Sequence, residues 1–132
     1  MKSTSRSALG LAALLAGAGS IHFLRPLPYD KIIPARLPGR PRTWTYVSGV
    51  AELGCAAAVA LPRTRRAGAL LAAGLFVGVF PANVKMACDW RGRPLRFRTV
   101  AYARLPLQAP LVVWALNVAQ VAQIRERAAA SV

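Results

Sequence analysis

A carboxylate, Glu52, lies near the middle of an apolar segment long enough to cross a membrane as a helix. A carboxylate at the centre of a membrane helix costs about 2.5–3.5 kcal/mol on insertion scales, so it normally faces the protein interior, a partner or water. Thr45, Ser48 and Cys55 recur around Glu52 at spacings of three and four residues, which puts all four on one helix face. We therefore expect an inward-facing polar stripe with Glu52 as its deepest strongly polar group.

In the other apolar segments, polar side chains lie in the same half of the expected bundle as Glu52, toward one end of the helices. At 1.5 Å per residue, Glu52 itself lies ~13 Å from that end. We call this end the loop face, because it carries the connections 25–42 and 85–104. We expect a polar pocket that opens there, with eight candidate residues: Glu52, His22, Arg25, Tyr29, Ser48, Asn83, Arg104 and Gln108.

Most of these candidates also have a purely structural explanation. A position at headgroup level accounts for His22, and snorkelling at helix ends accounts for the two arginines. Asn83 and Gln108 have the residue types of interhelical hydrogen bonding, which is worth about 0.6 kcal/mol per bond. Glu52 is the residue that a structural role explains least well.

Four apolar segments must position these side chains: 8–24, 43–61, 67–87 and 105–124. Each has about the length that a helix needs to span the ~30 Å hydrocarbon core. Hydrophobic residues make up 55% of the 132 residues, which leaves almost nothing for a soluble domain. The sequence predicts an all-α fold, a polytopic membrane four-helix bundle that forms one domain over 1–132 and has both termini on the same side.

The N-terminus allows a second interpretation. Lys2 and Arg6 precede the first apolar run, and Ala16-Gly17-Ala18 resembles a signal-peptidase site, whose cleavage would leave three crossings. The apolar character continues through Ile21 and Phe23, beyond a usual signal core. This favours retention of the segment as the first membrane helix.

The basic residues avoid the apolar segments and gather in the connections. The net charge is +14, from 18 Lys and Arg against four acids. This distribution is typical of charges that face lipid headgroups, and it argues against a nucleic-acid partner because no aromatic stacking platform accompanies it. The loop face holds 11 of the 18 basic residues, which favours its placement in the cytoplasm, whereas the dense Arg63–Arg66 turn favours the opposite orientation.

The connection 25–42 is rich in proline and is unlike an ordinary linker. Its prolines prevent a long helix, and apolar side chains such as Ile32, Ile33 and Leu37 lie among them. We expect an irregular or short-helical cap between the first two helices that folds onto the bundle at the membrane interface. A solvated hairpin loop is the alternative.

Two cysteines and one histidine limit the redox and metal chemistry. Cys55 lies about 18 Å from the loop face and Cys88 lies at it, whereas a disulfide requires Cα atoms within ~7 Å. The sequence has no C-x-x-C motif, and His22 is its only histidine. We therefore expect no disulfide, metal or haem, and a quinone is the cofactor left open.

Small residues at spacings of three and four predict close helix packing. The first helix offers Ala8, Ala12, Ala16 and Gly19, and the second and third offer Ala56, Ala60, Gly74 and Gly78. Such stripes let membrane helices approach closely. We expect a leucine at Gly78 to disrupt the bundle. The oligomeric state, including a homo-oligomer, stays open.

Four ordered motifs are similar to those of one family, the DoxX-like integral membrane proteins. They are His22-Phe23 with Pro26, Tyr29, Ile32-Ile33-Pro34 and Leu37-Pro38; Tyr46-Val47-Ser48-Gly49-Val50-Ala51-Glu52; Phe80-Pro81-Ala82-Asn83-Val84; and Arg104-Leu105-Pro106-Leu107-Gln108 with Trp114. The resemblance covers nearly the whole chain and implies a four-helix, mostly bacterial membrane protein without an assigned activity. Some relatives are linked to redox work: a thiosulfate:quinone oxidoreductase subunit, a methylamine-dehydrogenase maturation protein and thiol-oxidative-stress complexes. Without a cysteine pair, this chain does not fit a direct thiol-oxidoreductase role.

Three functions follow from these observations, and the sequence does not decide whether the protein is an enzyme. The first is a membrane subunit or assembly factor whose polar pocket around Glu52 and basic loops hold a membrane or soluble protein partner. The second is a quinone-linked redox component, and the third is a small-solute or proton pathway. The high content of Ala, Arg and Gly is typical of a GC-rich bacterial genome, so we expect a bacterial plasma membrane location.

Overall fold

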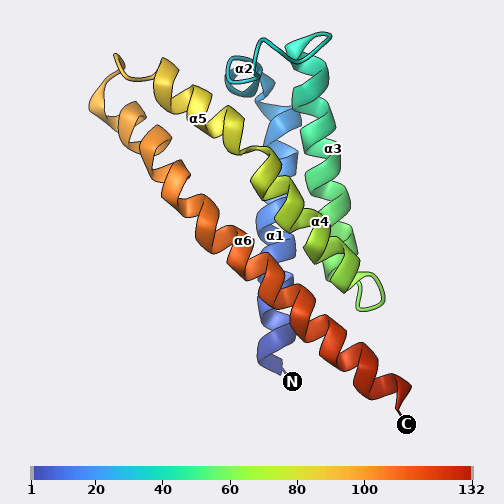
Figure 1. The fold of residues 1–132 in the computed structure, drawn as a ribbon. Coiled ribbons are helices and arrows are strands. Elements are labelled where there is room, and N and C mark those ends of the chain that lie inside the picture. Colours follow the sequence, from blue (N-terminus) through green and yellow to red (C-terminus); the bar gives the residue numbers. More distant parts are fainter. Residues whose placement is uncertain (1, 132) are drawn as a thin grey trace.

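The computed structural model describes residues 2–131, and the regular structure of this part is entirely α-helical, as predicted. Figure 1 shows the first turns of α1 and the last turns of α6 at the same end of the molecule, with α2 and the turn between α5 and α6 at the opposite end. In chain order the helices are α1 Lys2–Leu24, α2 Pro26–Asp30, α3 Pro41–Ala60, α4 Arg65–Gly78, α5 Phe80–Asp89 and α6 Leu95–Ala130.

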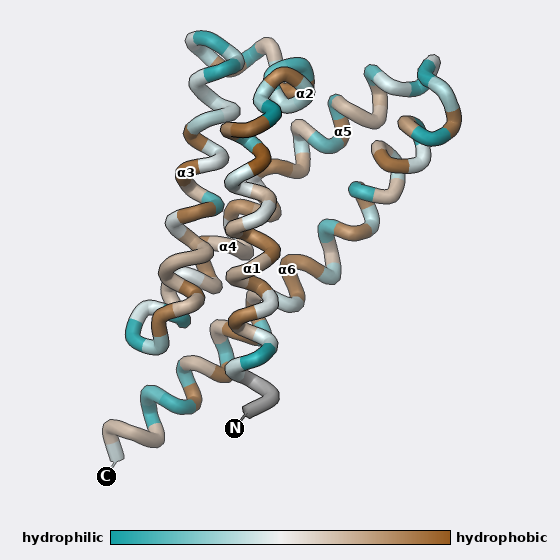
Figure 2. The backbone as a smooth tube through the Cα atoms, turned by 180° about the vertical axis from the view of Figure 1, so that it is seen from behind, coloured by the Kyte–Doolittle hydropathy of each residue, from teal (hydrophilic) through white to brown (hydrophobic). Residues whose placement is uncertain are grey.

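Three helical segments are long and apolar enough to cross a membrane. They are Ser5–Leu24 of α1, Arg65–Asp89, which joins α4 and α5, and Leu95–Ala130, which is α6. The predicted span 43–61 is also helical, as 20-residue α3, but α3 is not among the helices that are long and apolar enough to cross a membrane. Figure 2 shows hydrophilic residues concentrated toward the two ends of the molecule.

The third predicted span is divided in two. Pro81 lies in the first turn of α5 and has no N–H to donate to the preceding turn, so the helix breaks at Val79. The Val79 amide donates to the Leu75 carbonyl (3.0 Å), and the Asn83 amide donates to the Val79 carbonyl (3.2 Å). The break leaves the two pieces close to a common axis (Figure 1).

The basic connection predicted over 85–104 is largely helical. α5 continues to Asp89 and α6 begins at Leu95, so only the residues between them form the turn. The segment from Leu95 to Arg104 has no glycine or proline, and arginine is a good helix former, which explains the early start of α6. The connection between the two helices is therefore shorter than predicted, because α5 and α6 both extend into 85–104.

Alanine dominates the contact region of α1, α3, α4 and α6. One continuous cluster of buried residues draws on all four helices, and it includes the fully buried Leu11 and Val59. The predicted small residues Ala8, Ala12 and Ala56 belong to this cluster, and Ala16 and Ala60 pack against it. α1 packs along α3, α4 packs along α6, and the short turn after Ala60 makes α3 and α4 neighbours.

The proline-rich connection forms a short helix and a series of turns that fold back onto α3 and α5. Ile32 is buried, the Trp44 Nε1 donates to the Pro38 carbonyl (2.7 Å), and the Lys85 Nζ donates to the Lys31 carbonyl (3.1 Å). The segment therefore has the short-helical form expected of the cap, and we use that name for residues 25–40. Gly39, with φ of 87°, turns the chain into α3 in a conformation that favours glycine.

The close contact of α1 and α3 lies at Gly19, which belongs to the predicted stripe, and at Gly49, whereas Gly74 and Gly78 of the same prediction meet no neighbouring helix within the described part of the chain. A Cβ at Gly49 would come within 2.9 Å of the His22 Cβ and 3.1 Å of the Gly19 carbonyl oxygen, so α1 and α3 nearly touch there. At Gly78 no described atom lies within 4 Å of an added Cβ, so the expectation of close packing at Gly78 was wrong. The three- and four-residue spacing identifies a small-residue stripe but not the side of α4 that meets a neighbour.

We predict that Gly68→Ala lowers the free energy of unfolding by about 1–3 kcal/mol, because overpacking forces the backbone to shift. The added Cβ would lie 2.6 Å from the Ala58 Cβ and 2.7 Å from the Val59 amide nitrogen. The control is Gly74→Ala in the same helix, where no described atom lies within 4 Å. Thermal unfolding in mild detergent measures both, and equal midpoints for the two variants would contradict the close α3–α4 contact.

Candidate functional site

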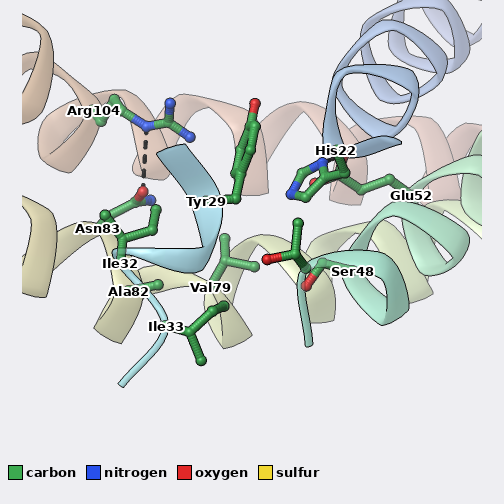
Figure 3. Close-up of a pocket in the computed structure, with 11 residues that line it drawn as sticks. His22, Tyr29, Ile32, Ile33, Ser48, Glu52, Val79, Ala82, Asn83 and Arg104 are labelled. Atoms are coloured by element: carbon green, nitrogen blue, oxygen red, sulfur yellow. Dashed lines mark hydrogen bonds and ion pairs between the residues drawn. The ribbon is translucent and has the colours of Figure 1, made fainter. Parts of the chain in front are cut away.

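A small polar cavity lies at the loop face, under the cap and between α1, α3, α5 and α6. Its volume is about 60 Å³, which is room for a few water molecules or one small chemical group. Figure 3 shows Glu52 and His22 at one side of this cavity, Arg104 and Asn83 at the other, and Tyr29 between them. Its lining residues are His22, Tyr29, Ile32, Ile33, Thr45, Ser48, Glu52, Val79, Ala82, Asn83 and Arg104.

Glu52 presents a buried oxygen without a hydrogen-bond partner among the described residues. This atom is Oε2, and the His22 Nδ1 lies 3.4 Å from it. The same Nδ1 lies 2.9 Å from the Ala18 carbonyl oxygen. Because a carbonyl can only accept, Nδ1 carries a hydrogen and donates it to Ala18. The imidazole is thus held by its own helix, and the carboxylate oxygen keeps a free lone pair.

Tyr29 of α2 closes the cavity from the cap. Its ring packs on the His22 imidazole with centroids 3.9 Å apart and planes tilted by 30°. Burial raises the pKa of the Tyr29 hydroxyl above its ordinary value, so the phenol stays neutral at physiological pH. The cap therefore contributes an uncharged aromatic wall beside the carboxylate.

An amide network supports the opposite side of the cavity. The Asn83 Nδ2 donates to the Gln108 Oε1 (2.8 Å), and the Arg104 Nε donates to the Asn83 Oδ1 (3.3 Å). The Gln108 Nε2 donates to the Phe76 carbonyl oxygen in the last turn of α4. Carbonyls of a final turn lack an intrahelical partner, so Gln108 satisfies backbone that the break at Val79 exposes.

Asp30 fixes the cap to the start of α3. Its carboxylate accepts hydrogen bonds from the Thr45 Oγ1 (2.6 Å) and from the Arg42 Nε (2.8 Å). Burial favours a higher pKa for Asp30, but the hydrogen bonds from Thr45 and Arg42 and the charge of Arg42 together lower the pKa below its ordinary value. Thr45 is fully buried and lines the cavity, so the cap and the cavity share this contact.

The structure brings six of the eight candidate residues to the cavity wall: His22, Tyr29, Ser48, Glu52, Asn83 and Arg104. Gln108 lies behind Asn83, as its hydrogen-bonded support. Arg25 instead lines a neighbouring hollow, because α1 ends at Leu24 and the backbone leaves the helical region at Arg25, with φ −137° and ψ 66°.

Sequence reasoning did not identify the role of Asp30. The signal was present, because Asp30 is the only acid in the cap, and Thr45 belongs to the polar stripe that includes Glu52. The two cysteines are free thiols as predicted: Cys55 is buried in the alanine cluster, and Cys88 is exposed. Within residues 2–131, no group of three His, Cys, Asp or Glu side chains is placed to hold a metal ion.

Comparison with known proteins identifies a family. The family model described as "Domain of unknown function (DUF8561)" matches residues 11–119, and the chain belongs to that family. Searches of curated proteins and of solved structures gave no match. The matched range includes every residue of the cavity wall.

We predict that Gln108→Leu destabilises the protein by about 1–2 kcal/mol, because it leaves the Phe76 carbonyl and the Asn83 amide without their partner. Thermal unfolding in mild detergent measures the loss. Gln120→Leu, at an exposed position of the same helix, is the matched control and leaves the midpoint nearly unchanged. The amide network would not be a support if both variants unfolded at the same temperature.

We predict that the contribution of Asp30 to stability is lost in acid. Because the pKa of Asp30 is lowered in the folded state, this contribution is present above the unfolded pKa and disappears as the pH falls below about 4. Unfolding midpoints recorded from pH 6 to pH 3 test this. Asp30→Asn flattens that part of the profile, whereas Asp89→Asn, which removes an exposed partner of Lys85, leaves the wild-type slope. Parallel profiles for wild type and Asp30→Asn would contradict the assignment.

Proposed function

We propose that this member of the DUF8561 family is an integral membrane subunit or assembly factor whose cavity around Glu52 binds a hydrogen-bond-donating group of a partner. In this proposal four helical segments cross the bilayer, in the manner of the DoxX-like proteins that the chain resembles. The membrane is a bacterial plasma membrane, and both termini lie on one side of it.

The observation that carries this proposal is the unpartnered Glu52 Oε2. A buried acceptor without a partner costs about 1–3 kcal/mol, and more when it is charged. The neighbouring His22 Nδ1 already donates to Ala18, so it does not fully relieve this cost. A donor that enters the cavity, such as an ammonium or hydroxyl group, removes the cost and gains a hydrogen bond.

The size of the cavity indicates what enters it. A volume of about 60 Å³ accommodates a terminal group of a few heavy atoms rather than a whole cofactor. The side chain or end group of a larger partner fits this limit. The loop face also holds 11 of the 18 basic residues, which suit a partner with an acidic surface.

The outer face of α3 supports α3 as the fourth crossing. Val47 is 52% exposed and Val50 is 62% exposed, whereas Thr45 and Glu52 on the opposite face point inward. A helix with an apolar outer face and an inward polar stripe suits a position between lipid and a protein interior. The short connection to α4 also places α3 antiparallel to a segment that is long and apolar enough to span.

A quinone-linked redox component is the second candidate, because an apolar groove adjoins the cavity. The groove has a volume of about 520 Å³ and lies between the cap, α3 and the α4–α5 break. It shares Ile33, Ser48, Val79 and Ala82 with the cavity wall. In this candidate the prenyl chain of a quinone lies in the groove, and one oxygen of its ring reaches the cavity.

We predict that Glu52→Gln weakens partner recovery about tenfold or more, because a hydrogen bond to a charged group is worth about 1.5–3 kcal/mol. The tagged protein is purified in mild detergent from native membranes, and co-purified proteins are quantified by mass spectrometry. Glu126→Gln, an exposed carboxylate near the far end of α6, is the matched control and retains the partner.

An organic extract of the same samples separates the two candidates. The binding proposal expects extracts of equal composition from wild type and both variants. A stoichiometric quinone that disappears only in Glu52→Gln would establish the second candidate instead. Equal partner recovery and equal extracts in all three samples would overturn any binding role of the Glu52 cavity.

A further inference from the structure

A second hollow lies beside the Glu52 cavity, on the other side of Tyr29, Ile32 and Arg104, which line both. Its volume is about 170 Å³, nearly three times that of the cavity, and it lies between the end of α1, the cap, α5 and α6. Two guanidinium groups, those of Arg25 and Arg104, line it. We infer that this hollow binds the phosphate group of an anionic phospholipid.

The charge of the hollow suits an anion from outside the chain. Its lining includes two arginines and no acid. Among the described acids, Asp30 is held by Arg42 and Thr45, and Asp89 is held by Lys85. Glu52 lies at the far side of the neighbouring cavity (Figure 3). Two positive charges that share a hollow repel each other, and an anion between them adds an attraction to each that outweighs the repulsion.

The donors of both arginines are available. Arg104 uses Nε to reach the Asn83 Oδ1, which leaves its two terminal nitrogens free of any protein acceptor among residues 2–131. The Arg25 guanidinium makes no hydrogen bond or ion pair within the same part of the chain. A planar guanidinium donates two parallel hydrogen bonds to phosphate oxygens. Each of the two arginines therefore offers a fork of two donors, Arg104 from α6 and Arg25 from the end of α1.

The rest of the lining matches the hydrocarbon part of a lipid. Ile21, Met86, Trp90 and Val100 complete the walls, and Ile21 and Val100 are 44% and 52% exposed. Figure 1 shows that α5 and α6 lean away from α1 at this end, and these side chains line the hollow between the helices. A basic pocket between membrane helices at headgroup level, with apolar walls, suits a phospholipid better than a free anion.

This inference requires the membrane placement proposed above, but it does not require any ligand in the Glu52 cavity. Extraction of the membranes with alkaline carbonate tests the placement separately, because an integral protein stays in the pellet. Glu52→Gln should lose its partner and still bind the phospholipid. The two proposals therefore fail independently.

We predict that Arg25→Gln lowers the retention of phosphatidylglycerol about tenfold or more, because it removes one of the two guanidinium forks. The protein is purified in mild detergent and incubated with phosphatidylglycerol, phosphatidylcholine or inorganic phosphate. Native mass spectrometry counts bound lipid, and the unfolding midpoint reports stabilisation. Wild type and Arg40→Gln, a control that removes an exposed charge at the same end, retain about one phosphatidylglycerol and gain stability. Arg25→Lys keeps the charge but not the fork and retains an intermediate amount.

Three results would overturn the inference. Equal retention by Arg25→Gln and Arg40→Gln would mean that the lipid responds to total charge rather than to this hollow. Equal stabilisation by inorganic phosphate would assign the hollow to a free anion. Equal retention of phosphatidylcholine would show that the net charge of the lipid is not recognised.

Discussion

A carboxylate within an apolar helix has to be kept away from hydrocarbon, and the arrangement at the loop face follows from this constraint. Gly19 and Gly49 bring the backbones of α1 and α3 so close that His22 lies against Glu52. The cap then covers the pair with Tyr29, and Asp30 anchors the cap on Thr45 of the same α3 face that carries Glu52. His22 and Tyr29 thus line the cavity beside the acid, and Thr45 joins that cavity to the cap.

The second polar element of the interior is the break at Val79. A proline in a helix frees backbone groups, and within a membrane these need partners from neighbouring helices. Gln108 supplies one such partner and also holds Asn83, which in turn receives Arg104. The cavity wall opposite Glu52 is therefore built from side chains that also satisfy the backbone groups freed by the helix break. Sites of irregular backbone in membrane proteins commonly coincide with cavities for this reason.

Much of the helical architecture could be predicted, because long apolar runs and short polar turns leave few alternatives. The polar stripe on α3 and six of the eight candidate residues at the cavity also followed from periodicity and depth. The helical start of α6 did not follow from these patterns. The arginines between Leu95 and Arg104 indicate a basic connection by their charge, but their backbone propensity is helical. The position of Arg25 depends on the backbone just past a helix end, and the close contact of Gly49 depends on helix rotation. Neither quantity is encoded in residue spacing.

The division of one span into α4 and α5 has a mechanical consequence. α4 belongs to the alanine cluster, whereas Met86 and Ala87 of α5 belong to a separate cluster with Ile32 and Ala101. The molecule thus has two packed clusters, one on each side of Val79, and Gln108 hydrogen-bonds to a residue on each side of this division. A change in the bend at Val79 would therefore reshape the cavity wall at Ala82 and Asn83, whereas the alanine cluster contains no residue of α5.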